Sequence, residues 1–488
     1  MYSEKMNLET TFTFDDVLLE PAESWVEPDE ADVRSRFSRN IPLNIPLVSA
    51  AMDTVTESVM AITMAREGGI GVIHRNLPAE REVAEVRIVK QAEDLIEREV
   101  VTVGPESTVT DVERVMKQYG IGGVPIITDD RVIGIVSRRD IRAILPRQGD
   151  AKITGYMTKN LITASEDITA DSALDTMYSN KVERLPVVDG QGRLVGIITM
   201  RDILEKRQYP RANRDANGRL RVAAAVGPFD FNRAMMLVEA GVDALVVDCA
   251  HGHNMNVVKA VREIKASVAV DVVAGNIATR EAASVLVDSV DGLKVGIGPG
   301  SICTTRIVAG VGVPQISAIA NVAEVARDAG VPVIADGGIR YSGDIAKAIA
   351  AGADCIMAGS LFAGTDEAPG RVTTIKGRRY KQYRGMGSLG VMSSGESSDR
   401  YFQKKGIGRT KFVPEGVEGV TPYVGRVSDV IYQLVGGLKS AMGYTGSKTI
   451  PDLKKNGKFI RITPAGYGES HPHNIMITDE APNYRLFE

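Results

Sequence analysis

The sequence predicts a (β/α)8 barrel of the TIM type that carries an inserted module of two repeats. Short apolar runs ending in Gly, Ser, Asn or Asp alternate with amphipathic stretches, the pattern of alternating strands and helices. The runs are continuously apolar, as expected of parallel strands that are buried on both faces. They fall into two groups, separated by a block at 95–205 that contains an internal repeat.

The first group predicts two strand-helix units. Its runs lie at 45–53 and 69–75, and the stretch SVMAITMAREGG between them has apolar residues that suit a helix packed on a sheet. The second group supplies six further runs, at 222–227, 244–252, 268–276, 292–298, 331–338 and 355–360. Eight strands with intervening helices favour a closed barrel over an open sheet.

The separating block predicts a discrete module. Segment 107–141 matches segment 167–203, and each predicts a helix, a strand through GVP or RLP, a turn, a second strand and then an aspartate. Two copies imply an intramolecular pseudo-dimer. The polar stretch 208–219 is rich in turn formers and suits a linker back to the barrel. The expected domains are therefore a barrel in two parts, 1–94 and 206–488, around the module.

A long glycine-rich segment follows the eighth strand. Residues 377–425 hold many glycines and charges and little hydrophobic periodicity. A loop of this length is usually a functional lid or disordered. We therefore expect a loop without regular structure beside the barrel.

Composition excludes several classes of protein. The 488 residues are 44% hydrophobic and 25% charged, and no apolar run is long enough to cross a bilayer. The amino terminus is acidic and lacks the apolar core of a secretory signal, so we expect a cytoplasmic protein. A formal net charge of −4 gives no general attraction to nucleic acid or a membrane surface.

The cysteines and histidines do not predict a metal or disulfide framework. Cys249, Cys303 and Cys355 are too few to staple a chain of this length, and we expect free thiols in a reducing compartment. They lack the CxxC spacing of a structural zinc site, and the five histidines are scattered. We therefore predict no transition metal.

Cys303 is the candidate nucleophile. Active sites of barrels lie in the loops after the strands, and the sixth run leads into GIGPGSICTTR at 296–306. The glycines of this loop expose backbone groups and the cysteine together, and a thiolate is a strong nucleophile. Cys249 and Cys355 lie on apolar strands, where the commoner role of a small buried hydrophobe applies.

The seventh and eighth strand ends predict a nucleotide site. They read ADGGIR at 335–340 and AGS at 358–360, where barrels often bind phosphate through glycine amides. Asp336 can accept hydrogen bonds from a pair of ribose hydroxyls. Such glycines can also serve only to turn the chain, but two such ends on neighbouring strands favour a bound nucleoside monophosphate.

Several long motifs together resemble the IMP dehydrogenase family. They are GIGPGSICTT, ADGGIR with YSGDIAKA, YRGMGS at 383–388, DRYF at 399–402 and EGVEG at 415–419. The resemblance runs the whole length, and the inserted repeat resembles the paired CBS (cystathionine-β-synthase-type) modules of that family. It implies an NAD-dependent oxidation of IMP to XMP, the rate-controlling step of guanine nucleotide biosynthesis.

The resemblance assigns the chemical steps to four residues. The Cys303 thiolate would add to C2 of the purine, and loss of hydride to NAD⁺ would leave a covalent thioimidate, with Thr305 also in the catalytic set. A mobile flap at about 393–420 would then close and bring Arg400 and Tyr401 to activate water. Arginine is an unlikely general base because its pKa exceeds about 12 and it is normally protonated, so its surroundings would have to favour the neutral form. The alternative for Arg400 is an exposed loop side chain.

The resemblance also assigns the ligand contacts. The phosphate would contact Ser301, Gly338, Gly359, Ser360 and Tyr383, the ribose would contact Asp336, and Gly337 would also belong to the substrate site. The base would contact Gly385, Met386, Gly387 and Glu415, and NAD⁺ would contact Asp248, Asn276, Gly296 and Gly298. The family usually has a hydroxyl residue after Asp248, where this chain has Cys249.

A monovalent cation, an oligomer and nucleotide effectors are implied as well. Potassium would be held by carbonyl oxygens of Gly298, Gly300 and Cys303, with Glu469, Ser470 and His471 of a neighbouring subunit. The shared ion implies a homotetramer, or an octamer of paired tetramers. Purine nucleotides would bind the repeats through Asp140 and Asp202, unless the repeats are structural and have lost ligand binding.

Two other functions remain open at this stage. GMP reductase shares the barrel and the cysteine loop but deaminates with NADPH, and it typically lacks the flap pair and the inserted repeats. A chain that only senses purine nucleotides, with the barrel as scaffold, would bind ATP or GTP without reducing NAD⁺.

Overall fold

The computed structural model describes residues 8–394, 400 and 412–484, without the side chains of Asp202, Glu205, Lys206 and Ser394. The chain divides into two compact units. One comprises Met1–Ala92 together with Arg211–Glu488, and the other is Glu93–Pro210.

The larger unit contains a closed barrel of eight parallel strands, which confirms the predicted fold. Their order around the barrel is β10, β11, β12, β13, β14, β15, β4 and β5. Every strand falls on one of the eight apolar runs, because strands buried on both faces need no polar alternation, and β12 extends one residue past its run, to Ile277. They are β4 (Leu47–Ser49), β5 (Ile70–Ile73), β10 (Ala223–Val226), β11 (Ala244–Asp248), β12 (Asp271–Ile277), β13 (Gly292–Val295), β14 (Val333–Asp336) and β15 (Cys355–Ala358).

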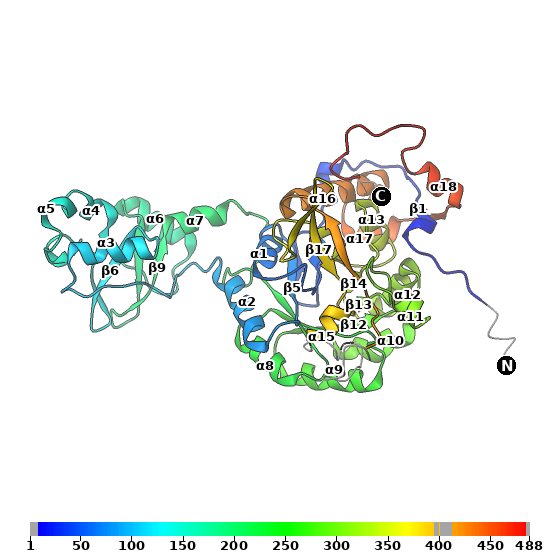
Figure 1. Ribbon diagram of the computed structural model, residues 1–488, viewed down its shortest axis with the longest axis horizontal. Helices are drawn as coiled ribbons and strands as arrows, with labels where there is room; N and C mark the ends of the chain where they lie inside the picture. The colour runs from blue at the N-terminus through cyan, green and yellow to red at the C-terminus, as the bar shows by residue number, and fades with distance from the viewer. Residues whose placement is uncertain (1–7, 395–399, 401–411, 485–488) are drawn as a thin grey trace. The chain divides into compact units, whose positions relative to one another are not determined.

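One long helix follows each barrel strand. Helices such as α8, α9 and α10 lie outside the strands in Figure 1. The eight are α1 (Ser58–Arg66), α2 (Ala79–Gln91), α8 (Phe231–Glu239), α9 (Met255–Ser267), α10 (Arg280–Leu286), α12 (Gln315–Asp328), α13 (Ser342–Ala350) and α16 (Val427–Tyr444). Among the described residues, no helix combines the length and apolar character needed to cross a lipid bilayer.

Small and branched side chains fill the barrel interior. The core includes Ala223, Ala225 and Ala244 beside Val246 and Val273, all fully buried. At the amino-terminal end of the strands, a hairpin of β2 (Ser35–Arg36) and β3 (Pro42–Leu43) inserts Phe37 into the same core. The barrel is therefore closed by packing at this end, which leaves the other end for the site.

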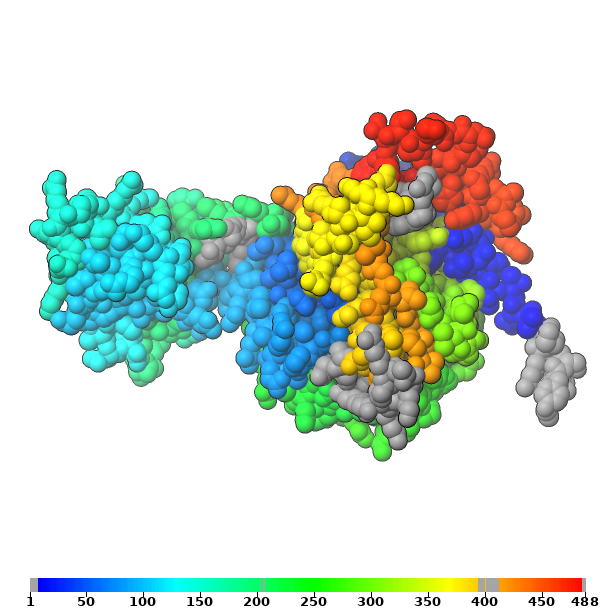
Figure 2. Space-filling model, viewed as in Figure 1, coloured from blue at the N-terminus to red at the C-terminus, as the bar shows by residue number. Residues whose placement is uncertain are grey.

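The segment after the eighth strand is more regular than predicted. We expected 377–425 to lack regular structure, but it contributes to an antiparallel sheet of β16 (Val372–Ile375), β17 (Arg378–Arg384) and β18 (Glu418–Pro422), with α15 (Leu389–Ser394) between the last two strands. All of β16 and most of β18 are exposed, so their sequences carry no buried apolar stripe. Figure 2 shows the yellow and orange surfaces of this region side by side on one face of the larger unit.

Short elements complete the larger unit. β1 (Val17–Leu19) pairs antiparallel with β19 (Phe459–Arg461), which joins the two ends of the chain. The others are α11 (Thr305–Val308), α14 (Ser360–Ala363), α17 (Ile450–Asn456) and α18 (Pro464–Glu469).

The smaller unit consists of two similar halves. Each contains a helix, an antiparallel strand pair and a second helix, and each has its own apolar core. The Leu194 amide donates to the Asp130 carbonyl at 2.8 Å, and Arg139 pairs with Glu183 at 2.7 Å, so the halves are joined. The elements are α3 (Val109–Gln118), β6 (Gly123–Thr128), β7 (Arg131–Ser137), α4 (Arg138–Arg142) and α5 (Leu145–Gln148), then α6 (Ala170–Asn180), β8 (Arg184–Val188), β9 (Leu194–Thr199) and α7 (Met200–Arg207).

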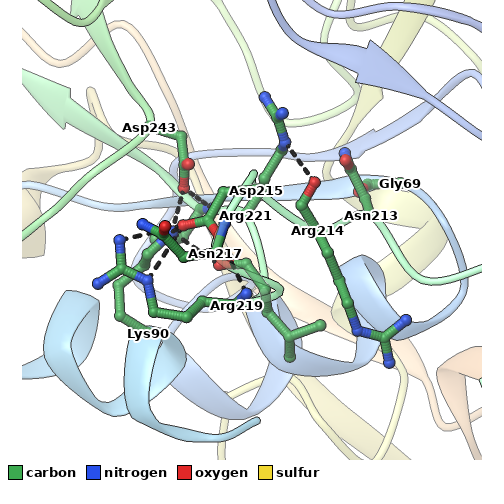
Figure 3. Close-up of polar contacts among 11 residues, drawn as sticks. Gly69, Lys90, Asn213, Arg214, Asp215, Asn217, Arg219, Arg221 and Asp243 are labelled. Atoms are coloured by element: carbon green, nitrogen blue, oxygen red, sulfur yellow. Dashed lines mark hydrogen bonds and ion pairs between the residues drawn. The ribbon is translucent and has the colours of Figure 1, made fainter. Parts of the chain in front are cut away.

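A buried ion-pair network fixes the segment that re-enters the barrel. Lys90, at the end of α2, contacts Asp243 at 2.8 Å, and both Asp215 and the Leu220 carbonyl at 3.0 Å (Figure 3). Arg219 also pairs with Asp215. The Lys90 side chain is only 5% exposed, so its ammonium compensates two carboxylates that water barely reaches.

This network predicts a large stability loss on its removal. Lys90→Met leaves two carboxylates without their buried cation and should lower the free energy of unfolding by about 3–5 kcal/mol. Lys265→Met is the matched control, because Lys265 pairs with Asp291 at 2.6 Å but is 32% exposed; its loss should cost at most about 1 kcal/mol. Urea denaturation followed by circular dichroism measures both, and equal losses would contradict the assignment.

Candidate active site

One cavity at the carboxyl ends of the barrel strands collects most of the predicted site residues. Cys303, Asp336, Asp248, Glu415 and Arg400 all line it. These residues are far apart in the sequence and come together because the loops of parallel strands share one end of the barrel. Also in the lining are Asn276, Gly296, Gly298, Gly300, Thr305, Gly337, Gly359, Tyr383, Gly385, Met386 and Gly387.

The loop that presents Cys303 depends on glycine. Gly296 and Gly298 have φ values of 150° and 77°, which side chains rarely adopt, and a Cβ at Gly296 would lie 2.2 Å from the Asp336 carbonyl oxygen. The Cys303 thiol, partly exposed, donates to Thr305 Oγ1 at 3.2 Å. A hydroxyl at this distance can instead donate to the sulfur once the thiol is ionised.

Arg306 stabilises the same loop, a role that the sequence did not predict. Its guanidinium donates to the carbonyls of Ile297 at 3.0 Å and Val313 at 2.6 Å. Burial lowers the pKa of Arg306, and its electrostatic interaction with Cys303 opposes that shift. A cation is thus held close to the candidate nucleophile, three residues further along the chain.

Backbone hydrogen bonds tie the cysteine loop to two other segments. The Thr304 amide donates to the Glu415 carbonyl, and the Val417 amide donates to the Ile302 carbonyl, both at 3.0 Å. The Glu415 amide in turn donates to the Gly387 carbonyl at 3.0 Å. The predicted base-contacting residues and the nucleophile therefore belong to one connected structure.

The predicted phosphate contacts lie around a neighbouring hollow. Ser301, Gly338 and Ser360 line a second cavity, which shares Pro299 with the first. Gly359 and Tyr383 line the first, and a Cβ at Gly359 would lie 2.7 Å from the Tyr383 hydroxyl. Burial raises the pKa of Tyr383, so this phenol stays protonated as a hydrogen-bond donor.

A buried lysine that the sequence analysis missed joins the two predicted ribose carboxylates. Lys294 on β13 contacts Asp248 at 2.9 Å and Asp336 at 2.7 Å, and it also donates to Asn276 Oδ1. These four residues come from the adjacent strands β11, β12, β13 and β14. A lysine inside the apolar run GLKVGIG was the available signal, because buried lysines are almost always paired.

A bulge in β12 directs Asn276 into this network. The register between β12 and β13 shifts between Gly275 and Ile277, so Asn276 has no partner in the ladder. Its amide donates to the Gly296 carbonyl at 2.8 Å and to Asp336 Oδ2 at 2.9 Å. The predicted cofactor residue thus also contacts the first residue of the cysteine loop.

A second missed ion pair supports the segment that carries Met386. Arg384, at the end of β17, donates to both carboxylate oxygens of Asp53, with Nε at 3.2 and 3.0 Å. Asp53 also accepts from Asn76 at 2.8 Å. This bidentate pair fixes residues 385–387 against the loop after β4.

Arg400 lies within the cavity and not on the surface. Its guanidinium pairs with Asp248 Oδ2, and its carbonyl accepts from the Ala250 amide at 3.1 Å. The predicted flap residue and the predicted cofactor residue are therefore in contact. Tyr401, its predicted partner, is outside the described residues.

The remaining thiols are buried, as predicted for cysteines on apolar strands. Cys249 and Cys355 are both fully buried. Burial also raises the pKa of Cys355 well above its usual value. Of the three thiols, Cys303 alone is partly exposed, although the buried Cys249 also borders the cavity.

The predicted potassium residues near the carboxyl terminus and the predicted effector residues are not among those that line the cavity. Glu469 ends α18 and Ser470 caps it, while His471 Nδ1 lies 2.8 Å from the Tyr484 hydroxyl. In the smaller unit, Asp140 Oδ2 accepts from the Ser137 amide at 2.7 Å and the Ser137 hydroxyl at 2.8 Å, which caps α4. Asp202 lies in α7, and its side chain is outside the described part of the chain.

The chain is similar to known proteins over nearly all of its length. A family model described as "IMP dehydrogenase / GMP reductase domain" matches residues 11–473. Inosine-5′-monophosphate dehydrogenase of Halobacterium salinarum is 58% identical, covering 99% of this chain and 97% of the relative. The corresponding enzyme of Methanocaldococcus jannaschii is 56% identical, covering 97% of each chain.

A solved structure matches as well. A GMP reductase variant from Trypanosoma brucei in complex with guanosine 5′-monophosphate is 41% identical, with a TM-score of 0.86. The match covers 97% of this chain and 100% of that one. Because it spans the inserted unit, the insertion does not separate the two activities, contrary to the criterion used in the sequence analysis.

Burial of two thiols predicts selective alkylation. Brief treatment with iodoacetamide under native conditions should modify Cys303, because its side chain is partly exposed. Cys249 and Cys355 should stay unmodified, because both are fully buried, even though Cys249 borders the cavity. Peptide mass spectrometry reads the three sites, with urea-unfolded protein as the control in which all three react. Equal labelling of the three in the folded protein would contradict this geometry.

Proposed function

This chain belongs to the IMP dehydrogenase / GMP reductase family, and from that premise we propose that it oxidises IMP to XMP with NAD⁺. The observation that carries the proposal is a single cavity that holds Cys303 beside Asp336, Met386 and Asp248. A nucleophile, a ribose acceptor and a second carboxylate are the groups that a nucleotide oxidation with a dinucleotide requires. Identities of 58% and 56% with IMP dehydrogenases, against 41% with the GMP reductase, favour this direction.

Cys303 would act as a covalent nucleophile. Its sulfur forms a bond to C2 of IMP, the C2–H bond then breaks with loss of hydride, and a thioimidate remains on the protein. Water adds to the same carbon, the C–S bond breaks, and XMP leaves as the thiol is restored. Thr305, whose hydroxyl lies 3.2 Å from the sulfur, would stabilise the thiolate.

The substrate would be oriented from three sides. Asp336 and Gly337 would accept the ribose, and Ser301, Gly338, Gly359, Ser360 and Tyr383 would surround the phosphate. The base edge would meet Gly385, Met386, Gly387 and Glu415. Support comes from the backbone bonds that connect the last group to the cysteine loop. Correct placement is worth several orders of magnitude in rate.

Asp248 would serve the cofactor and the flap in turn. The cavity offers Asp248, Asn276, Gly296 and Gly298 to NAD⁺, and a carboxylate suits ribose hydroxyls. When bound, NAD⁺ supplies the hydride acceptor. Because Arg400 pairs with the same carboxylate, Arg400 and a bound cofactor would compete for Asp248, and Arg400 with Tyr401 would activate the hydrolytic water once the site is free.

A potassium ion fits the loop that carries Cys303. Gly298, Gly300 and Cys303 lie in one glycine-rich loop, where the Gly300 carbonyl also accepts from the Cys303 amide at 3.0 Å, and backbone carbonyl oxygens suit a large, weakly hydrated cation. Glu469, Ser470 and His471 lie at the carboxyl end of α18, where helix carbonyls lack intrahelical partners and carry partial negative charge. Joined across a subunit boundary, these two sets would hold potassium in a homotetramer, or in an octamer of paired tetramers.

The smaller unit is proposed as a CBS-type module that binds purine nucleotides in a cytoplasmic enzyme. Its two halves surround a cavity lined by residues of both, including Tyr119, Gly122, Arg184 and Arg201. Asp140 already caps α4 through Oδ2, so a ribose would have to use its other oxygen.

GMP reductase is the second candidate, favoured by the solved structure of that activity. The two activities use opposite redox reactions, so two assays on one preparation separate them. Absorbance of the reduced cofactor should rise with IMP, NAD⁺ and potassium, and should not fall with GMP and NADPH. The reverse result would assign the chain to the reductase.

Removal of the Cys303 sulfur should abolish IMP oxidation but leave IMP binding intact. Cys303→Ala should produce no reduced cofactor from IMP and NAD⁺, while calorimetry still detects IMP binding. Cys355→Ala is the matched control, because that thiol lies in the barrel core, and it should retain turnover. Substantial turnover by Cys303→Ala would remove the residue from its role.

Removal of the flap arginine should affect the second half of the reaction. Arg400→Ala should give a rapid burst of about one reduced cofactor per site, because hydride loss does not need it, followed by slow hydrolysis. The exposed Arg327 supplies the control Arg327→Ala, which should behave as wild type. Stopped-flow absorbance separates the phases, and a loss of burst and steady state together would refute the assigned step.

A further inference from the structure

The Lys294 ammonium is shared between two ligand sites, and we propose that Lys294 is a positioning residue that couples nucleotide binding to cofactor binding. The inference rests on the function proposed above. An ammonium has three N–H donors, and those of Lys294 are matched by Asp248, Asp336 and Asn276. The lysine therefore connects the proposed IMP ribose site directly to the proposed NAD⁺ ribose site.

The Lys294 ammonium interacts strongly with its carboxylate partners because the group is buried. Its side chain is 2% exposed, and that of Asp248 is 3% exposed, so water screens the pair weakly. Asp336 retains 18% exposure and lines the cavity. One buried cation thus holds two carboxylates, and Arg400 adds a second cation on the far oxygen of Asp248.

The surrounding backbone leaves the ammonium little freedom to move away. Gly275 lies opposite Lys294 in the β12–β13 ladder, and a Cβ at Gly275 would be 2.6 Å from the Lys294 Cβ. Asn276 adds a bond from its amide to Asp336 Oδ2 at 2.9 Å. Among the described residues, both side-chain donors to Asp336 reach this one oxygen, so a ligand hydroxyl would meet Oδ1.

In this arrangement the two ligands would be coupled because one ligand orders the side chains that bind the other. IMP bound at Asp336 fixes that carboxylate and, through the ammonium, fixes Asp248. A cofactor that binds next meets an acceptor already in place and loses less conformational entropy on binding. Each ligand should therefore tighten the binding of the other.

The coupling can be measured without turnover in the Cys303→Ala background. Calorimetry gives the Kd of IMP with and without saturating NAD⁺, and NAD⁺ should tighten IMP binding about fivefold or more. Adding Lys294→Met should reduce this factor at least about threefold, although direct contact between the ligands preserves part of it. Adding Lys90→Met instead removes an equally buried lysine from the opposite end of the barrel and should leave the factor unchanged.

Two results would overturn the proposal. One is that NAD⁺ does not change the Kd of IMP in Cys303→Ala. The other is that NAD⁺ tightens IMP binding equally with and without Lys294→Met in folded protein. Failure of wild-type chain to reduce NAD⁺ with IMP would instead overturn the proposed function. If the wild-type enzyme is active but Lys294→Met leaves the NAD⁺ effect on IMP binding unchanged, the coupling is refuted and the proposed function is not.

Asp336→Asn provides a test that does not depend on the folding of the lysine variant. The substitution is nearly isosteric and replaces one of the two charged partners of Lys294 with a neutral amide, so the network that fixes Asp248 should be weakened. With IMP absent, Asp336→Asn should bind NAD⁺ about threefold more weakly than the wild type does. This effect would have to act through Lys294, because Asp336 is assigned to the IMP site and not to the NAD⁺ site. Equal NAD⁺ affinity in the two proteins would contradict the coupling.

Discussion

Two carboxylates at the end of a barrel can be buried only if a cation is buried with them. Asp248 and Asp336 are shared by the Lys294 ammonium, and the rest of the cavity is arranged around that charge. Isolated buried charges cost several kcal/mol each, whereas a hydrogen-bonded network tolerates them. The same carboxylates can then accept ribose hydroxyls because the Lys294 ammonium fixes them in place.

The reactive loop depends on this frame through its first residue. The Gly296 carbonyl accepts from Asn276, which also contacts Asp336, and Gln315 bridges the carbonyls of Val295 and Asp336. From there the loop turns through glycines to Cys303 and hydrogen-bonds to the segments around Gly387 and Glu415. Nucleophile, ribose acceptor and base contacts are thereby held in fixed register, while Arg400 comes from a segment that must move in the proposed cycle.

The sequence predicted those parts whose physics is local. Eight doubly buried strands appear as apolar runs, and glycines around Cys303 indicate a loop that exposes backbone. A mostly exposed strand such as β18 carries no such stripe, which is why 377–425 was predicted to be an irregular loop. Lys294 was hidden inside an apolar run, and the Arg384 pair with Asp53 joins residues too far apart for any sequence pattern to connect. The contact of Arg400 with Asp248 likewise required coordinates.

The central claim is that the sulfur of Cys303 bonds to the purine during turnover. Acid quenching in the steady state, followed by peptide mass spectrometry, tests it most directly. The account predicts that the peptide containing Cys303 carries the added mass of the oxidised nucleotide, and that this adduct disappears when IMP is exhausted. Steady turnover with unmodified Cys303, or with the adduct on another residue, would contradict it.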